Sequence, residues 1–427
     1  MALSVAVRTF DWLTTDALNA TIDVNFGFTP KAIMLVSCTS QTATGVSTTV
    51  ARGAARIGFA GGTLSANRTC LAYETFDGAA AADVRSWQSN AAICHLSGST
   101  GRLDIDAEAN WPANSIRFIV EQAMSLGINA HITVLALGGT DIVASTTGTI
   151  TEPAGTGDQT ITTTGVNPTL VILATAGPTD VDAVHGDGCF MLGAGDGTRS
   201  WVQAMGSDDA AATMDTVGYM KSGQIVALMP VATAVTIDAE ATLVSLGTAQ
   251  FVLNWSTRTA AARHIKYLAI ELATSLVRVD SLTTATDLNN FSVTGYGMTP
   301  AGLILVSAGR AESTATTPTA NSMLSVGMIE STTVREAQAM RDDDAVANAD
   351  VTVALDTAEG YINLTPSGTV DATMDLVSFD SDGMTLVMDN AEASASFVGV
   401  IAFGAAAAGG GAASLSTGGI LTMVGVQ

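Results

Sequence analysis

The feature that most constrains this chain of 427 residues is a pattern that occurs three times along it. A Gly-x-x-Pro turn followed by an apolar run has its prolines at Pro30, Pro168 and Pro300, so the intervals are 168 − 30 = 138 and 300 − 168 = 132 residues. Repetition at a nearly fixed interval is typical of an array of similar structural units. We therefore expect three copies of one domain.

Further blocks follow each turn in the same order: an acidic loop tip, a short segment with an internal aspartate, and a closing apolar run. The spacing from that aspartate to the closing run is 29, 30 and 30 residues, for Asp106 to Leu135, Asp238 to Leu268 and Asp371 to Ile401. A domain of this length buries enough surface to hold a core. The predicted domains are 1–139, 140–272 and 273–404, followed by a Gly/Ala linker and C-terminal arm at 405–427.

The apolar runs are short, rich in Val, Ile, Leu and Thr, and bounded by Gly, Pro, Asn and Asp, which is typical of strands. Lys31–Val36 and Leu170–Leu173 are continuous runs, apolar apart from Lys31 itself, as expected for strands covered on both faces. No window has a capped helical stripe. The fold class that we predict is all-β, with three tandem homologous β-sandwich domains of jelly-roll-like or similar Greek-key type and a short C-terminal arm.

Charge limits the possible partners. Acidic residues outnumber basic ones 40 to 17, and the three lysines are scattered, so no basic surface for phosphates is expected. The longest nearly apolar stretch, Phe397–Ala413, is rich in Ala and Gly, and Met1–Phe10 lacks a signal-peptide pattern. We therefore expect neither nucleic-acid binding, nor a membrane span, nor a secretory signal.

The cysteines are not arranged as a disulfide framework or a metal site, because none of them forms a C-x-x-C pair and three lie in the first third of the chain. They are Cys38, Cys70, Cys94 and Cys189. We expect reduced, packed thiols in a protein made in a cytoplasm.

Catalytic motifs are not found: the sequence has no G-x-S-x-G elbow, no H-E-x-x-H and no P-loop. The glycine-rich Gly193–Gly197 is expected to be a hairpin turn. We therefore expect no catalytic residues, no cofactor and no enzymatic activity. A hydrolase is a third, weaker alternative to the functions given below, and it would need a pocket with convergent carboxylates.

Two pairs of carboxylates invite comparison with the acid and base of a glycosidase, but each pair lies along a single strand rather than across a pocket. The pairs are Asp106 with Glu108 and Asp238 with Glu240, and the third copy has Asp371 followed by Thr373. We expect an exposed strand face at these positions.

Acidic loop tips supply oxygens of the type that bind Ca²⁺, although no EF-hand pattern is present. They contain Asp77, Asp208–Asp209 and Asp342–Asp344. A solvated turn is the preferred interpretation, and a structural Ca²⁺ stays open.

Histidine and tryptophan occur singly along the chain. We expect His95, His131, His185 and His264 to have hydrogen-bonded structural roles rather than to bind metal. We expect Trp87, Trp111, Trp201 and Trp255 to lie in the core or at its rim.

The blocks at Gly27–Leu35 (GFTPKAIML) and Val134–Gly139 (VLALGG) resemble the opening and closing strands of repeated β-rich modules in virion structural proteins of tailed bacteriophages. Gln250–Trp255 (QFVLNW) also fits, whereas the second and third copies end at Leu272 and Gly404 without a full A-L-G-G. The resemblance implies a non-enzymatic protein of the virion, made in the host cytoplasm, with no catalytic residues.

On this resemblance we expect a capsid decoration protein, a head or tail fibre, or a tail accessory component that contacts other virion proteins. A homo-oligomer stays open. Three copies in one chain suit a threefold site, and a linear string along a fibre explains them equally well. The alternative is a module that binds host-surface carbohydrate.

An apolar segment behind the glycines is the candidate docking arm onto neighbouring subunits. Its residues are Leu415, Ile420, Leu421, Met423 and Val424.

Overall fold

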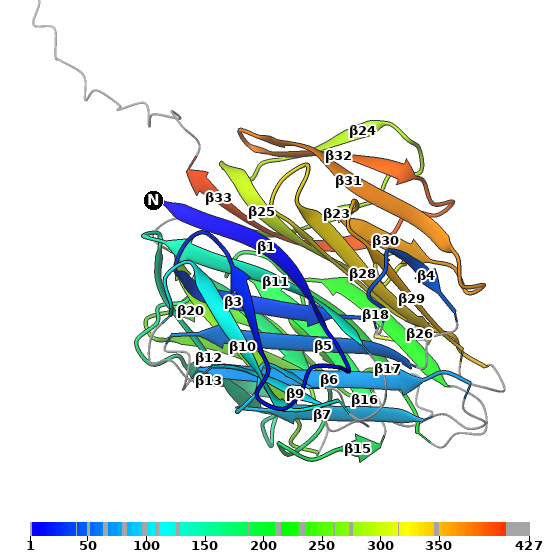
Figure 1. The fold of residues 1–427 in the computed structure, drawn as a ribbon, viewed down its shortest axis with the longest axis horizontal. Helices are drawn as coiled ribbons and strands as arrows, with labels where there is room; N and C mark the ends of the chain where they lie inside the picture. Colours follow the sequence, from blue (N-terminus) through cyan, green and yellow to red (C-terminus); the bar gives the residue numbers. More distant parts are fainter. Residues whose placement is uncertain are drawn as a thin grey trace, which may run out of the picture.

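The computed structural model describes residues 2–39, 41–48, 52–62, 67–78, 83–95, 101–106, 111–124, 129–186, 188–209, 215–229, 236–258, 261–272, 276–314, 316–345 and 350–406. These residues form strands, turns and loops, and no helix occurs among them (Figure 1). The all-β prediction is confirmed. No helix in this part of the chain is long and apolar enough to cross a membrane.

The strands fall into three series, which we call the first, second and third units. The first unit consists of β1 (Leu3–Trp12), β2 (Thr21–Asn25), β3 (Pro30–Ser37), β4 (Gly45–Ser47), β5 (Arg52–Gly61), β6 (Arg68–Phe76), β7 (Val84–Ser89), β8 (Cys94–His95), β9 (Arg102–Ile105), β10 (Ser115–Gln122) and β11 (Ala130–Gly139).

The second unit consists of β12 (Ile142–Thr151), β13 (Gly157–Thr162), β14 (Leu170–Thr175), β15 (His185–Gly186), β16 (Gly188–Gly195), β17 (Ser200–Ser207), β18 (Thr216–Ser222), β19 (Val226–Leu228), β20 (Ala239–Gly247), β21 (Gln250–Thr257) and β22 (His264–Leu272). The third consists of β23 (Val277–Thr283), β24 (Asn290–Thr294), β25 (Met298–Ser307), β26 (Thr319–Ala320), β27 (Ser322–Ile329), β28 (Arg335–Asp342), β29 (Val351–Asp356), β30 (Tyr361–Leu364), β31 (Val370–Asp380), β32 (Gly383–Asn390) and β33 (Phe397–Ala406).

Each unit pairs its strands in the same order. In the first unit a sheet runs β1-β11-β3-β5-β6-β7, and a separate 4-stranded sheet runs β2-β10-β9-β8; the second and third units repeat both orders with their own strands. All strand pairs are antiparallel, for example β1 with β11 and β3 with β5. Homology of the units and the domain limits given above stay predictions.

The fourth strand of every unit is missing from these lists because it joins the sheet of another unit. β4 of the first unit pairs with β29 of the third, β15 of the second with β7 of the first, and β26 of the third with β18 of the second. Each exchanged strand completes a 7-stranded sheet. The exchange is cyclic and closes the three units into a ring.

Each large sheet is covered on both faces. In β3, Ala32, Met34 and Val36 point into a core shared by all three units, whereas Ile33 and Leu35 point into the core between the two sheets of the first unit. The second and third units have the same arrangement. Burial on both faces explains the continuous apolar runs and confirms that prediction for β3 and β14.

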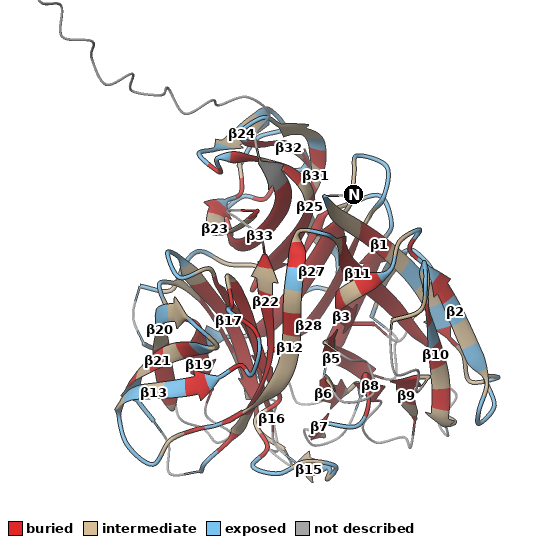
Figure 2. Cartoon of the chain, turned by 90° about the vertical axis from the view of Figure 1, so that its left-hand side faces the viewer, coloured by how far each residue is buried: buried red, intermediate tan, exposed pale blue. Residues whose placement is uncertain are grey.

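Exposed residues gather on the outer, four-stranded sheets. Figure 2 shows buried residues along the inner strands of the large sheets, whereas the edge strands β1, β12 and β23 are mainly partly buried and β2, β13 and β24 are mainly exposed or partly buried. The large sheets therefore lie inside the molecule and present little polar surface.

One glycine in each unit permits the close packing of its two sheets. A Cβ at Gly58, Gly193 or Gly327 would overlap with a backbone carbonyl oxygen of the strand or loop that crosses it, at Ile93, Ile225 or Gly360 respectively. These glycines occupy equivalent positions in β5, β16 and β27. A side chain at any of them would separate the sheets.

We predict that Gly327→Ala lowers the free energy of unfolding by about 2–3 kcal/mol, because the carbonyl of Gly360 is backbone and has no rotamer to escape the overlap. Gly247→Ala is the matched control, since its Cβ would lie 3.5 Å from the Gln250 side chain. Urea denaturation measures both. Equal stability of the two variants would contradict this account of the sheet packing.

Candidate functional site

The contacts between units form an extensive set of specific polar interactions in the described part of the chain. We call them the 1–2, 2–3 and 3–1 seams after the units that they join. Each seam includes one exchanged strand, and its loop adds bonds of its own. At the 1–2 seam, for example, the Gln88 side chain donates to the carbonyls of Pro178 (3.1 Å) and Asp180 (2.9 Å).

The aspartate at each acidic loop tip accepts a backbone N–H from another unit. Asp77 accepts from Val351 (3.2 Å), Asp209 from Val84 (3.0 Å) and Asp344 from Thr216 (3.0 Å). The three donors are the first residues of β29, β7 and β18. The three bonds thus run cyclically around the ring, one in each seam, and each satisfies an N–H at the start of a strand.

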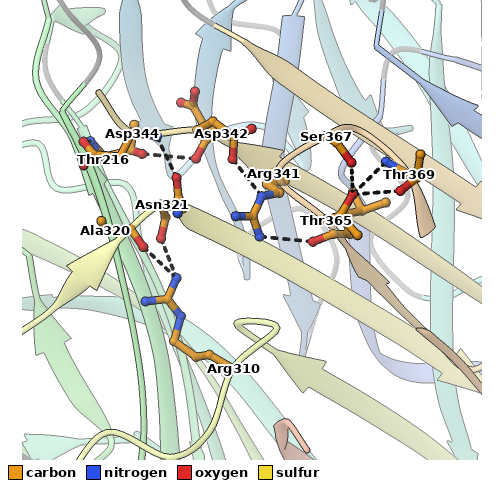
Figure 3. A network of polar contacts seen from close by, with 12 residues as sticks. Thr216, Arg310, Ala320, Asn321, Arg341, Asp342, Asp344, Thr365, Ser367 and Thr369 are labelled. Atoms are coloured by element: carbon orange, nitrogen blue, oxygen red, sulfur yellow. Dashed lines mark hydrogen bonds and ion pairs between the residues drawn. The ribbon is translucent and has the colours of Figure 1, made fainter. Parts of the chain in front are cut away.

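Figure 3 shows this arrangement at the 2–3 seam. The backbone N–H of Asp344 donates to the Asn321 side chain (2.8 Å), and the hydroxyl of Thr216 donates to the carbonyl of Asp342 (3.1 Å). Below them, Arg310 donates to the carbonyls of Ala320 (3.3 Å) and Asn321 (2.5 Å). The guanidinium therefore holds the exchanged strand β26 in place against β18.

The expectation that the acidic tips are solvated turns is wrong for the third unit. Asp342 and Asp343 are buried, because Asp342 points into the shared core and Asp343 pairs with Arg341 (2.8 Å). Among the described residues no three His, Cys, Asp or Glu side chains lie close enough to hold a metal ion. The tip aspartates therefore act in the structure as clasps between units.

We predict that Asp344→Ala lowers the free energy of unfolding by about 1–2 kcal/mol, because the N–H of Thr216 loses a charged acceptor. Asp350→Ala is the control: it removes an equal charge from an exposed side chain on the same loop. Thermal denaturation at low salt compares the two. If both variants lose the same stability, general charge and not the clasp is responsible.

A second set of bonds caps the outer edges of the large sheets. Glu330 accepts the backbone N–H of Val7 across the 3–1 seam (2.8 Å), and Asp196 accepts that of Val279 across the 2–3 seam (2.9 Å). At the 1–2 seam the Ser145 hydroxyl accepts from Gly62 (2.9 Å). An uncapped edge strand is a template for pairing with another chain, so the bonds to Val7 in β1 and Val279 in β23 close edges that the exchange leaves open. Gly62 follows the inner strand β5, so its bond links two units without covering an edge.

The middle of each seam differs in chemistry. At the 1–2 seam the fully buried Lys266 donates from Nζ to Asn90 (2.8 Å) and Thr149 (3.0 Å). Burial lowers the pKa of Lys266 to about 8. At the 2–3 seam the indole of Trp201 lies against Gly399 and donates to the carbonyl of Val400 (3.2 Å).

The 3–1 seam is centred on a histidine between two carboxylates. His131 Nδ1 lies 2.6 Å from Asp11 Oδ1 on the same unit, and Nε2 lies 2.9 Å from Glu336 Oε2 on the third unit. Thr133 also donates to Glu336, and Gln338 donates to Thr133 (2.6 Å). Burial alone would lower the pKa of His131, but the hydrogen bonds and charges of Glu336 and Asp11 outweigh it, and the pKa is raised.

The remaining histidines lie apart from one another. His95 stacks on Trp87 with ring centroids 3.6 Å apart, and burial lowers the pKa of His95 to about 3. His185, the first residue of the exchanged strand β15, pairs with Asp180, and His264 begins β22. The hydrogen-bonded role that the sequence predicts is therefore confirmed for His131 and His185, whereas His95 stacks on Trp87 and its Nδ1 has no hydrogen-bond partner among the described residues.

The other predicted packing residues lie where the sequence indicates. Trp87, Trp201 and Trp255 are buried in the core, and half-buried Trp111 donates to the carbonyl of Gly62 (2.7 Å). All four cysteines are buried and free, and desolvation raises the pKa of each thiol. The expectation of reduced, packed thiols is confirmed.

The carboxylate pairs do not form the exposed strand face that the sequence suggests. Glu240 is buried and accepts from the hydroxyl of Tyr219 (3.0 Å), and half-buried Asp238 pairs with Arg263. Tyr219 and Arg263 come from neighbouring strands and loops of the same unit, so both carboxylates stabilise its sandwich. In the first copy Glu108 lies outside the described residues, and Asp106 lies near Arg117 (3.9 Å).

The glycine-rich Gly193–Gly197 is only partly a turn: β16 continues to Gly195, and the hairpin turn is formed by residues 196–199. Beside it a cleft of about 280 Å³ at the 2–3 seam is lined by hydroxyl-bearing residues and by the Arg199–Asp280 ion pair. Its one carboxylate is thus paired with an arginine. The candidate arm residues Leu415, Ile420, Leu421, Met423 and Val424 lie outside the described residues.

Asp342 is a fully buried carboxyl of the ring. Burial is the main cause that raises the pKa of Asp342 to about 8, and the neighbouring carboxylates Asp343, Asp350 and Asp77 act in the same direction. The hydroxyl of Thr75 acts in the opposite direction and lowers the pKa. Its folded pKa exceeds the ordinary 3.8, so the folded state binds the proton more tightly. Stability from this group is therefore complete below pH 3.8 and is lost as pH rises through about 8.

We predict that Asp342→Asn removes this dependence. The variant should be more stable than the parent at pH 9, where the parent buries a charge, and this advantage should shrink steadily toward pH 5. Urea denaturation at several pH values gives the difference in free energy of unfolding between the variant and the parent. The contributions of all other titrating groups cancel in this difference. A difference that does not change with pH would contradict the assignment.

Sequence reasoning missed Asp11, Glu336 and the seam role of Lys266. A signal was present: Thr69, Trp201 and Glu336 occupy equivalent positions in β6, β17 and β28, and these three residues share no chemistry. A position that differs so strongly among otherwise similar units indicates a contact outside the unit.

Comparison of the chain with models of known protein families and with curated proteins gave no match.

Proposed function

We propose that the protein is a non-enzymatic structural component of a tailed-bacteriophage virion, built from three homologous, jelly-roll-like β-sandwich domains, and that it occupies a site of threefold symmetry. The cyclic strand exchange carries this proposal. A closed ring of three similar units presents three similar outer faces to three neighbouring subunits. A capsid decoration protein is the form of this function that the ring favours over a fibre.

The chemistry of the described residues supports a role in contacts. Charged groups pair with one another across and within the units, and polar side chains at the seams form bonds that hold the ring closed. The net charge of −23 disfavours contact with packaged DNA. Alternating polar residues cover the outer sheets, which leaves these sheets available for docking on virion proteins.

The carbohydrate-binding alternative needs an exposed aromatic ring. Among the described residues every Trp and Tyr is buried or half-buried, so no observation favours it. A glycan array is the direct test of this alternative, and under our proposal it shows no binding.

The proposal predicts where the protein lies in the particle. In cryo-electron microscopy of virions that carry it, we expect a three-lobed density centred on threefold or local threefold positions of the head. A second preparation in which the chain ends at Ala406 tests the arm: the ring stays folded, as thermal denaturation will show, and incorporation is lost. Density confined to the tail, or absent from purified virions, would overturn the head assignment.

A further inference from the structure

The three seams differ in how the chain connects them. A turn at Thr140 and Asp141 joins β11 to β12 across the 1–2 seam, and the chain passes directly from β22 to β23 across the 2–3 seam. No such connection spans the 3–1 seam, since the first and third units stand at opposite ends of the sequence. The ring is therefore closed there by non-covalent contacts alone.

The centre of that seam depends on a proton. Asp11 and Glu336 present carboxylate oxygens to the two ring nitrogens of His131 at 2.6 and 2.9 Å, and a carboxylate only accepts. An imidazolium donates to both, whereas a neutral ring has a single N–H and leaves one carboxylate facing a lone pair. Glu336 is almost completely buried, so water does not replace the lost donor.

The charged groups around His131 come from three strands. β1 contributes Asp11, β28 contributes Glu336, and β11 carries His131 itself; Thr133 and Gln338 are the neutral donors that remain on Glu336. Elsewhere at this seam Arg8 pairs with Glu330 (2.7 Å), Asp77 accepts the backbone N–H of Val351, and buried Asp342 faces Thr75 and Asp77 of the first unit. No described cation lies within ion-pair distance of Glu336 apart from His131.

We propose that the 3–1 seam is a proton-controlled latch: the ring is closed while the His131 imidazolium bridges Asp11 and Glu336, and it opens between the first and third units when His131 loses its proton. Opening frees the edge of β29, to which β4 is paired, and the edge of β1, which Glu330 caps. Among the described residues no histidine lies between two carboxylates at the 1–2 or 2–3 seam, and these seams stay closed.

The direction follows from proton linkage. The folded-state pKa of His131 lies above its ordinary 6.5, so the closed seam binds the proton more tightly than the open one. Closure is therefore strongest below pH 6.5 and is lost as pH rises through the raised pKa. Over that interval the opening equilibrium increases by up to about tenfold per pH unit, which corresponds to one proton.

Hydrogen exchange of the intact chain between pH 5.5 and 9 tests the latch. The measure is the exchange rate of peptides from β28 and β29 divided by that of the equivalent peptides from β6 and β7, because the ratio removes the intrinsic pH dependence of exchange. We expect the base-10 logarithm of this ratio to rise with pH, with a slope approaching one per pH unit, and then to level off. A ratio that stays constant overturns the proposal.

Two variants identify the group that is responsible. His131→Gln keeps hydrogen-bonding capacity without a titrating charge and should flatten the rise, whereas His264→Gln, at the equivalent position of β22, should leave it unchanged. Asp342 also titrates in this direction, so the measure is the part of the slope that His131→Gln removes. If that part is zero, or if His264→Gln removes as much, His131 is not the latch.

A measurement without any variant covers the case in which His131→Gln fails to fold. The NMR titration of the His131 ring in the intact chain should give a pKa above 6.5, with its midpoint in the pH range where the exchange ratio rises. A midpoint below 6.5 overturns the proposal.

Discussion

The exchange of one short strand between neighbouring units is the interaction on which the whole structure depends. β4, β15 and β26 have only two or three residues each, and an isolated pair of such length has no stability in water. They form because the shared core already holds the large sheets edge to edge. In return, each covers a strand edge that would otherwise be open to another chain. Core and exchange are therefore mutually required.

A single chain allows the three seams to differ, and they do. Lys266, Trp201 and His131 dominate the 1–2, 2–3 and 3–1 seams respectively, and each suits only its own partner. A buried lysine placed opposite Trp201 would have no acceptor, and Glu336 placed opposite Gly399 would lose the donors that His131 and Thr133 supply. Mismatched seams are penalised by buried, unpaired polar groups. The order of the units in the ring is thus fixed by chemistry as well as by chain connection.

The sequence predicts the fold well where one unit determines it. Continuous apolar runs such as Leu170–Leu173 indicate strands buried on both faces, because a pattern of two apolar faces needs no knowledge of the partner. The candidate site is harder to predict from the sequence. The exchanged strands are too short to have a periodicity, and a carboxylate such as Asp77 gives no sign that its partner, Val351, lies 274 residues away. Equally, nothing local distinguishes an aspartate that is solvated from one, like Asp342, that the ring buries.

The pairing of β4 with β29 has a consequence for synthesis on the ribosome. Gly45 meets Leu355, so 355 − 45 = 310 residues must be added after the first partner before the second exists. At about 5–20 residues per second, β4 of the nascent first unit waits roughly 15–60 s without the strand on which it pairs. Polysomes bring such unpaired strands from successive nascent chains close together. The chain is therefore most exposed to mispairing before its release, and a slow translation rate increases that exposure.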